Sequence, residues 1–359
     1  MTRVAEQDAV IVSTGRAKRI IKKTILKDPT TVIFMTGGPG VGKSAICRQV
    51  AEEIKYGYKE TFLLTRNPVD FAVPFPDESK KFLKLLPLRS ALPREEVDGK
   101  KGLWLLDEIS SAPLAVQVVA QRIVWDRRLE EEKVPDGWSI VAAGNRITDK
   151  GLVYQLPSPL AGRFTRIDIQ PDLDDWVESF AMPRHISHEV IACLRMNADM
   201  LYKFDPAKYQ GGAFPSPRGW EKVDRKMKNI GWVDEDFYTL AAGDVGMEGA
   251  GKLMAFLRVY DKLPKPEDVI NGKVIMDETE DRSLLFALAG TVVNYVVQSK
   301  KKDIMKLFLK NAVIPAPATF AVIMMKDVIS AGMKPMLVEK DILPSVHEVV
   351  KKFGKFLDL

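Results

Sequence analysis

Residues Gly37-Gly-Pro-Gly-Val-Gly-Lys-Ser44 decide the fold of this 359-residue chain, because they satisfy the pattern G-x-x-x-x-G-K-[ST] in full. An apolar, strand-like run at Thr31–Thr36 precedes them, and Ile46, Val50 and Ile54 follow at helical spacing. Glycines at a strand-to-helix bend let backbone N–H groups wrap phosphate oxygens, and the positive end of the helix dipole faces the same anion. The sequence therefore predicts a loop that binds a nucleoside triphosphate.

The residues of this loop have different expected roles. Lys43 is expected to reach the β- and γ-phosphates of ATP, and the Ser44 hydroxyl to bind a magnesium ion (Mg²⁺). The residues expected to contact the nucleotide are Gly37, Gly38, Pro39, Gly40, Val41, Gly42, Lys43, Ser44 and Ala45.

A later apolar run, Leu103-Trp-Leu-Leu, ends in two carboxylates, Asp107 and Glu108. At the end of a buried strand, Asp107 is expected to hold Mg²⁺ together with Ser44. Glu108 is then placed to polarise the attacking water as a general base. The alternative interpretation is a solvated acidic turn.

The alternation of strand-like and helix-like patterns in the first half of the chain predicts an α/β fold. Five apolar runs are too short and too continuous for amphipathic helices, and they fit strands buried on both faces. They are Thr31–Thr36, Thr61–Thr65, Gly102–Asp107, Trp138–Ala143 and Arg166–Gln170. Helical patterns separate them, so we expect a P-loop NTPase domain of three layers with a mostly parallel, five-stranded sheet.

Domain boundaries follow from changes in this pattern. Residues 1–170 are expected to form the ATPase domain, with a proline-rich insertion of loops and a short helix at about 66–99. After Gln170 the strand pattern stops, which predicts an all-α lid over 171–264 and a helical C-terminal extension over 265–359. A linker is expected at Lys262–Lys273, followed by two or three helices.

Composition excludes several classes of protein. Two cysteines, Cys47 and Cys193, are too few for a disulfide scaffold, which favours a reducing, cytoplasmic setting. The longest apolar run, Leu284–Val297, is shorter than the roughly 20 residues of a spanning helix, so no membrane association is expected. The net charge of +5 is compatible with nucleic acid but does not demonstrate it.

Three further segments carry a family resemblance. Ala142-Ala-Gly-Asn145 resembles the sensor 1 motif of AAA+ ATPases, and Gly151–Phe164 is similar to the segment that supplies an arginine finger in that family. Pro215-Ser-Pro-Arg218 resembles sensor 2. The order of these motifs is most similar to the MoxR-like branch, which includes the rubisco-activase and dynein-related ATPases, and the resemblance covers roughly residues 15–260.

The resemblance implies a set of functional residues and partners. Asn145 would orient the hydrolytic water, Arg163 would reach the nucleotide of a neighbouring subunit, and Arg218 would act from the lid. It further implies a homo-oligomeric ring, most often a hexamer, that remodels a protein partner with a von Willebrand factor A-type domain. The chain departs from the branch at Arg146, where proline is frequent, and its last hundred residues match no known pattern.

Several alternatives stay open at this point. Arg163 could instead cap the sheet edge or pair with a local carboxylate, with Arg166 as the next candidate finger, and Arg218 could form a surface ion pair. His185 and His188 are expected to be ordinary surface residues.

A second function, in place of remodelling a protein partner, also stays open. A DNA-directed motor or loader would use the lysines of the insertion, whereas the order of the motifs argues against a small-molecule kinase. The aromatic and basic side chains of the insertion suit a polypeptide or a single strand, unless the insertion folds onto its own domain. They are Phe71, Phe75, Phe82, Lys80, Lys81 and Lys84.

Overall fold

The chain divides into two compact units in the computed structural model, which describes residues 9–355 except 77, 80, 150, 152, 232, 233, 261 and 278–281. The first unit is Met1–Gln170 with Asp205–Tyr209, and the second is Pro171–Phe204 with Gln210–Leu359. The first is an α/β domain, and the second contains helices and no strand among its described residues.

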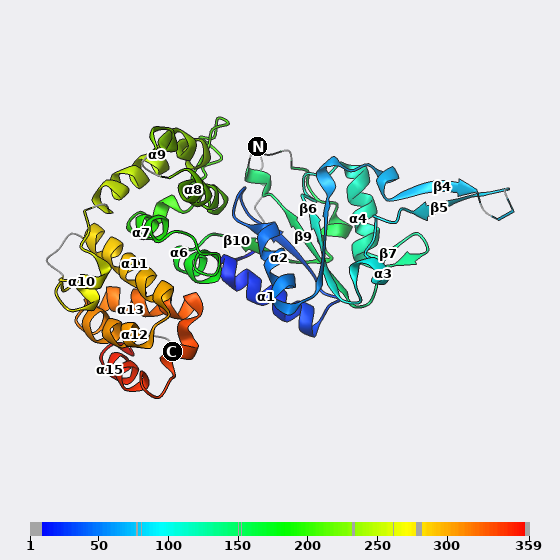
Figure 1. The fold of residues 1–359 in the computed structure, drawn as a ribbon. Helices are drawn as coiled ribbons and strands as arrows, with labels where there is room; N and C mark the ends of the chain where they lie inside the picture. The colour runs from blue at the N-terminus through cyan, green and yellow to red at the C-terminus, as the bar shows by residue number, and fades with distance from the viewer. Residues whose placement is uncertain are drawn as a thin grey trace. The chain divides into compact units, whose positions relative to one another are not determined.

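A six-stranded sheet forms the centre of the α/β unit, in the order β1-β10-β2-β9-β6-β3 with every pairing parallel (Figure 1). The strands are β1 (Val10–Val12), β2 (Val32–Thr36), β3 (Gly57–Phe62), β6 (Gly102–Asp107), β9 (Trp138–Gly144) and β10 (Phe164–Ile169). The P-loop NTPase fold of parallel strands and covering helices is thus present. Strands β6 and β9 are buried along their whole length, as their unbroken apolar runs predict.

The expected count of five strands is wrong, because β1 adds a sixth strand at the edge beside β10. This strand has three residues, of which Val10 and Ile11 are exposed, so it shows neither a long apolar run nor an alternation. The strand expected at Thr61–Thr65 lies instead at Gly57–Phe62, because the apolar run there does not mark the buried part of a strand. The edge strand β3 is half exposed, and the residues after it, Leu63–Thr65, form a 3₁₀ turn.

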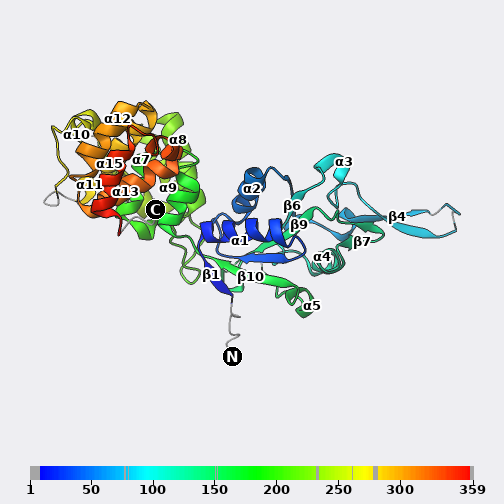
Figure 2. The same cartoon turned by 90° about the horizontal axis from the view of Figure 1, so that it is seen from below.

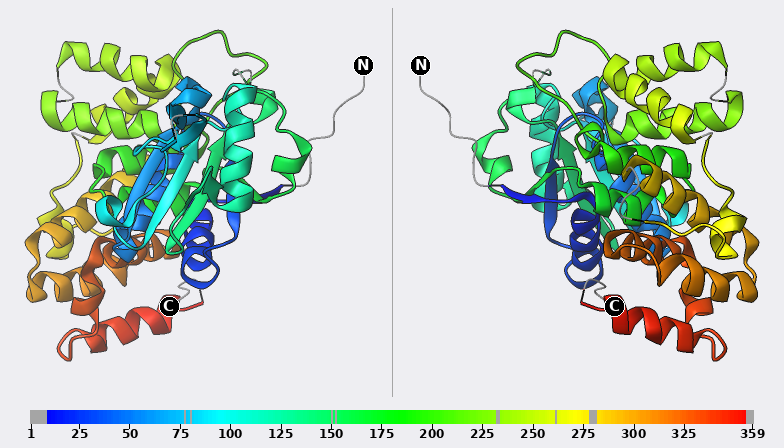
Figure 3. Two further views of the ribbon diagram at one scale, coloured as in Figure 1. Left: turned by 90° about the vertical axis from the view of Figure 1, so that its right-hand side faces the viewer. Right: turned by 90° about the vertical axis from the view of Figure 1, so that its left-hand side faces the viewer.

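Helices cover both faces of the sheet and complete the three layers. On one face lie α1 (Thr14–Lys27) and α2 (Lys43–Ile54), and on the other lies α4 (Leu114–Asp126), as Figures 2 and 3 show. Two short helices, α3 (Glu95–Asp98) and α5 (Ser158–Ala161), complete the unit. The buried side of α4 packs into one apolar core with strand residues such as Phe34, Trp104 and Ile140.

The insertion at 66–99 forms a β-hairpin rather than loops alone. Strands β4 (Ala72–Pro76) and β5 (Leu83–Pro87) pair with each other and extend away from the body of their unit (Figures 1 and 2). The apolar side chains Phe75, Phe82, Leu83, Leu85 and Leu86 are exposed, with Phe82 at 71% and Leu83 at 72%. The expectation of a short helix is met by α3. Lys80 lies outside the described residues.

The prolines of the hairpin explain why its sequence does not read as strands. Pro74 pairs with Leu85 and Pro76 pairs with Leu83. Proline cannot donate a ladder hydrogen bond, so it is confined to strands whose amide side has no partner. A two-stranded ribbon provides that position on both of its outer edges.

The second unit is a helical domain. Its α-helices are α6 (Leu173–Trp176), α7 (His188–Met196), α8 (Pro217–Ile230), α9 (Glu235–Tyr260), α10 (Pro266–Ile270), α11 (Arg282–Ser299), α12 (Lys302–Leu307), α13 (Ala318–Val328), α14 (Lys334–Leu337) and α15 (Leu343–Phe353). Three π-helical turns, Val177–Ala181, Phe308–Val313 and Ile329–Met333, continue α6, α12 and α13. Gly246, with φ 76°, kinks α9.

Two expectations for this unit are wrong. The stretch Lys262–Lys273 is not a linker, because α10 lies within it and buries Val269 and Ile270 in the core. More than three helices follow it, since α11 to α15 all lie beyond residue 273. One apolar core runs from Trp176 to Phe353, so the described helices share a single interior. This shared core does not mark a boundary between a lid and a C-terminal extension, and the boundary expected at residue 264 stays a prediction.

A buried ion pair joins two of these helices. Arg195 of α7 donates to both carboxylate oxygens of Asp327 of α13, at 2.7 and 2.5 Å. The two side chains are 10% and 3% exposed. None of the described helices is long and apolar enough to span a bilayer.

Candidate functional site

The glycine-rich loop connects the end of β2 at Thr36 to the start of α2 at Lys43. Gly40 and Gly42 have φ values of 80° and 99°, in the left-handed region that favours glycine. No side chain caps the amino end of α2, where Gly42 is the N-cap residue. The first-turn amides of α2 therefore suit an anion, as the sequence pattern predicts.

Lys43 lies within this loop and is almost fully buried. Its Nζ atom donates to the carbonyl oxygens of Gly37 at 2.7 Å and Gly38 at 3.2 Å, and to Asn145 Oδ1 at 3.0 Å. The ammonium group is thus held against the carbonyl oxygens of the loop and the end of β9. Its phosphate-binding role stays a prediction.

Ser44 and Asp107 form the candidate Mg²⁺ site. The Ser44 hydroxyl donates to Asp107 Oδ2 at 2.7 Å, and the Glu108 backbone N–H donates to Asp107 Oδ1 at 2.9 Å. Burial raises the pKa of the Asp107 carboxyl, and the hydrogen bond from Ser44 opposes that rise. A hydroxyl and a carboxylate at one point fit Mg²⁺, which binds proteins through one or two oxygen groups and takes its other ligands from phosphates and water.

Glu108 follows the end of β6 in a strained conformation, with φ 55° in the left-handed region. Its carboxylate accepts from Asn145 Nδ2 at 3.2 and 3.0 Å and from the Ser111 hydroxyl at 2.9 Å. Non-glycine residues in this region are uncommon and gather at functional sites. Glu108 is therefore a partly buried, oriented carboxylate, and the solvated acidic turn does not describe it.

Asn145 owes its position to the strand order. Strand β9 lies between β2 and β6, so the residue after its end stands between the loop that follows β2 and the carboxylates that follow β6. Ser110 braces the Asn145 backbone, because its hydroxyl accepts from the Asn145 N–H at 3.0 Å and donates to the Asn145 carbonyl at 3.2 Å. The sequence reasoning missed Ser110 and Ser111, although they follow Asp107 and Glu108 almost directly.

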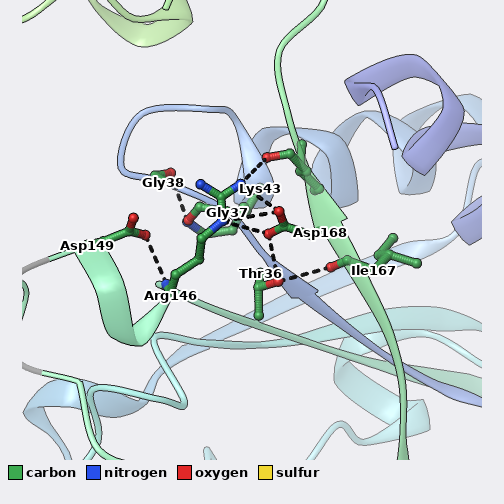
Figure 4. A network of polar contacts seen from close by, with 9 residues as sticks. Thr36, Gly37, Gly38, Lys43, Arg146, Asp149, Ile167 and Asp168 are labelled. Atoms are coloured by element: carbon green, nitrogen blue, oxygen red, sulfur yellow. Dashed lines mark hydrogen bonds and ion pairs between the residues drawn. The ribbon is translucent and has the colours of Figure 1, made fainter. Parts of the chain in front are cut away.

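Arg146 forms an ion pair at the edge of the site (Figure 4). Its Nε and Nη2 atoms donate to the two carboxylate oxygens of Asp168 at 2.7–3.1 Å, and the Thr36 hydroxyl donates to Asp168 Oδ1 at 2.9 Å. The Arg146 N–H donates to Asp149, whose carboxyl pKa is raised by burial. The departure from proline at this position therefore has a structural role: Arg146 ties the end of β9 to the ends of β2 and β10.

Arg163 lies at the opposite end of the sheet from the glycine-rich loop. It precedes Phe164, which pairs with Val32 at the start of β2, whereas the loop follows the other end of β2. The four residue steps from Val32 to Thr36, at about 3.3 Å each, separate the two ends of β2 by roughly 13 Å. The Arg163 guanidinium carbon lies 3.5 Å from the centre of the Trp125 ring.

The open alternatives for the arginines are narrowed by these contacts. Arg163 is exposed, and no carboxylate of a described residue pairs with it. The guanidinium carbon of Arg166 lies 5.8 Å from the centre of the Phe34 ring. Arg218 is exposed near the start of α8 in the helical unit and forms no ion pair with a described residue. Its role as sensor 2 stays a prediction.

Comparisons with known proteins provide little evidence about the role of this site. No family model matches the chain, and no curated protein matches it. Among solved structures, an inferred ATPase from Cytophaga hutchinsonii is 14% identical and is matched over 95% of this chain and 81% of its own length, with a TM-score of 0.34. The Thermotoga maritima RuvB Holliday junction branch migration motor is 15% identical over 90% and 86%, with a TM-score of 0.35. Similarity at this level carries no information about the activity of this chain.

Proposed function

We propose that the chain is an ATP hydrolase of the AAA+ class, most similar in motif order to the MoxR-like branch. One observation carries the proposal. The Asn145 amide accepts from Lys43 and donates to Glu108, so one side chain connects the phosphate-binding lysine with the candidate base. If the glycine-rich loop were only a structural turn and the Asp107–Glu108 pair only an acidic surface turn, this hydrogen-bonded connection between them would not be expected.

The chemistry follows from the positions of the side chains. Lys43 and the amides of α2 would bind the β- and γ-phosphates, and Ser44 and Asp107 would hold Mg²⁺. The metal ion, when bound, neutralises charge that develops on the bridging phosphate oxygens. Glu108 would orient the attacking water and accept its proton, with Asn145 and Ser111 fixing the carboxylate.

Arg163 is the proposed arginine finger, acting in trans. Such an arginine stabilises the charge of the transition state and accelerates transfer by roughly 10³–10⁵. Because Arg163 and the glycine-rich loop occupy opposite ends of one sheet, Arg163 cannot serve its own nucleotide. A contact between unlike surfaces of identical copies generates a ring when it closes, and a hexamer is the size that the resemblance implies.

The proposed cellular role is chaperone-like remodelling of a protein partner, for which the resemblance suggests a von Willebrand factor A-type domain. The β4–β5 hairpin supports a polypeptide over nucleic acid. Its exposed side chains are mostly apolar, and the described lysines on it are Lys81 and Lys84. A reducing, cytoplasmic setting belongs to the same proposal.

Three variants test the enzymatic part. Lys43→Ala is expected to abolish ATP binding, whereas Glu108→Gln is expected to bind ATP with Mg²⁺ and fail to hydrolyse it. Ser79→Ala, on the hairpin, serves as a control with wild-type activity. If the wild-type chain neither binds nor hydrolyses ATP with Mg²⁺ over a wide range of protein concentration, the proposed function is wrong.

The alternative, a DNA-directed motor or loader, makes a different prediction. Stimulation of hydrolysis by DNA that weakens steeply with salt would favour it, because phosphate contacts release counterions. Remodelling of a protein predicts indifference to DNA. It also predicts that the Glu108→Gln chain retains a bound polypeptide in ATP and that this polypeptide stimulates hydrolysis by the wild-type chain. The double variant Phe82→Ser/Leu83→Ser is expected to keep basal hydrolysis and to lose this stimulation.

A further inference from the structure

Trp125 presents its indole face to Arg163 on the surface of the α/β unit. The guanidinium carbon lies 3.5 Å from the ring centre, which is the distance of direct stacking, and the tryptophan remains 47% exposed. A guanidinium over an indole is attracted by the ring quadrupole. Since no described carboxylate competes for Arg163, this contact sets the direction of the side chain.

The backbone of Arg163 is held independently of that contact. Its N–H donates to the carbonyl of Leu160 at 3.1 Å, and the Leu160 side chain is fully buried. The next residue, Phe164, starts β10 and pairs with Val32 of β2. The base of the arginine is therefore fixed, and the remaining freedom of the long side chain is what Trp125 restricts.

Trp125 also ends an apolar stripe along α4. Leu114, Val118 and Trp125 follow each other by four and seven residues, so they lie on one side of the helix with the polar Gln121 between Val118 and Trp125, and the three apolar side chains are exposed. The opposite side, with Val116, Ala120 and Ile123, is buried in the core of the unit. A helix with apolar side chains on its outer as well as its inner side is typical of a surface that another molecule covers.

We propose that the stripe of Leu114, Val118 and Trp125 docks against a second copy of this chain, and that Trp125 is a positioning residue that aims Arg163 at the nucleotide of that copy. This inference rests on the proposed function. Arg163 lies at the opposite end of the sheet from its own loop, so the anion that complements it belongs to another copy. That copy must then cover the side chains around Arg163, and Trp125, at one end of the stripe, is in contact with Arg163.

The positioning role is tested with two substitutions of Trp125. Trp125→Ala is expected to lower kcat about tenfold, with the KM for ATP unchanged, because cation–π contacts contribute on this scale. Trp125→Phe, which keeps an aromatic face, is expected to recover most of the activity. A general loss of structure would instead reduce ATP binding as well, and phenylalanine would not selectively restore kcat.

The docking role is tested with a matched pair of valines. Val118 on the stripe and Val97 on α3 are 57% and 58% exposed, and asparagine is close to valine in size and helix propensity. In the Glu108→Gln chain with ATP and Mg²⁺, Val118→Asn is expected to raise the concentration needed for assembly about tenfold, as measured by light scattering. Val97→Asn is expected to leave assembly unchanged.

The outcomes separate this inference from the proposed function. If Arg163→Ala loses hydrolysis while Trp125→Ala keeps full kcat and Val118→Asn assembles normally, the inference is wrong and the proposed hydrolase stands. If Arg163→Ala itself hydrolyses ATP at the wild-type rate, the finger acting in trans and its positioning by Trp125 are both excluded.

Discussion

Asn145 Oδ1 accepts a hydrogen bond from Lys43 Nζ at 3.0 Å, although the two residues stand 102 positions apart in the chain. Parallel strands bring them together, because the end of β9 lies beside the end of β2. The same amide donates to Glu108. The carbonyl and amino groups of this amide therefore contact two different residues of the proposed site.

Replacing Asn145 tests the role of those contacts. Asn145→Ala is expected to lower kcat about 10²-fold, which is the cost of removing one oriented donor, while ATP affinity changes little. Asn145→Asp keeps an acceptor for Lys43 but removes the donor to Glu108, so its kcat should fall similarly. Single-turnover hydrolysis and equilibrium ATP binding measure the two quantities. Full turnover in both variants would mean that the amide has no role in hydrolysis.

Mixing two inactive variants tests the finger in trans. Arg163→Ala keeps an intact nucleotide loop, and Glu108→Gln keeps an intact Arg163. Rings assembled from both should recover part of the activity, because a Glu108→Gln copy can supply Arg163 to the intact site of its neighbour. The control mixes Lys43→Ala with Glu108→Gln at the same ratios. If the Arg163→Ala mixture stays as inactive as its components, Arg163 is not a finger of this kind.

The ion pair between Arg195 and Asp327 predicts a large effect on the helical unit. Asp327→Asn removes one partner of a pair buried between α7 and α13, and such changes cost about 3–5 kcal/mol of stability. The control is Glu248→Gln, which breaks the exposed pair with Lys203 and is expected to leave the stability nearly unchanged. Hydrogen exchange of the α7 and α13 amides reports on this unit directly. Unchanged protection in Asp327→Asn would contradict the prediction.

His188, which is partly exposed at the start of α7, predicts a pH dependence of stability. Burial lowers its pKa from 6.5 to about 4, with Asp327 and a hydrogen bond to Asn294 opposing the change. The folded state thus favours neutral imidazole, and the unfolded chain takes up a proton first. Stability is therefore complete above pH 6.5 and is lost as the pH falls towards 4, by up to about 3 kcal/mol.

The variant His188→Gln measures this contribution. Denaturant unfolding of the helical unit between pH 7 and pH 4 should show a shallower pH dependence in the variant than in the wild type. His185→Gln provides the control, because His185 is exposed and lies three residues away. Identical pH profiles for the two variants would show that His188 does not contribute.

The sequence predicts the centre of the α/β unit well because two physical signals coincide there. The continuous apolar runs of β2, β6 and β9 reflect strands buried on both faces, and the loop pattern reflects backbone geometry that glycine alone allows. The sequence also predicts that Asp107, Glu108 and Asn145 lie at or just after strand ends, which parallel topology gathers at one edge of the sheet. The roles of these residues remain predictions.

The elements that sequence reasoning missed depend on long-range pairing. Strand β1 has three residues and is a strand because it pairs with β10. Strands β4 and β5 contain three of the prolines that suggested loops. The contacts of Arg146 with Asp168 and of Arg163 with Trp125 join residues 22 and 38 positions apart (168 − 146 and 163 − 125), and no local spacing reveals them.

The prolines of the hairpin also limit how the protein can aggregate. Exposed ribbons with apolar side chains are templates for the addition of further strands, which leads to fibrils. Pro74 and Pro76 remove amide donors from the outer edge of β4, and Pro87 removes one from the outer edge of β5, where Leu83 and Leu85 keep theirs. A growing sheet needs competent edges on both sides of every member, so the missing donors on both strands of this ribbon oppose its propagation into fibrils.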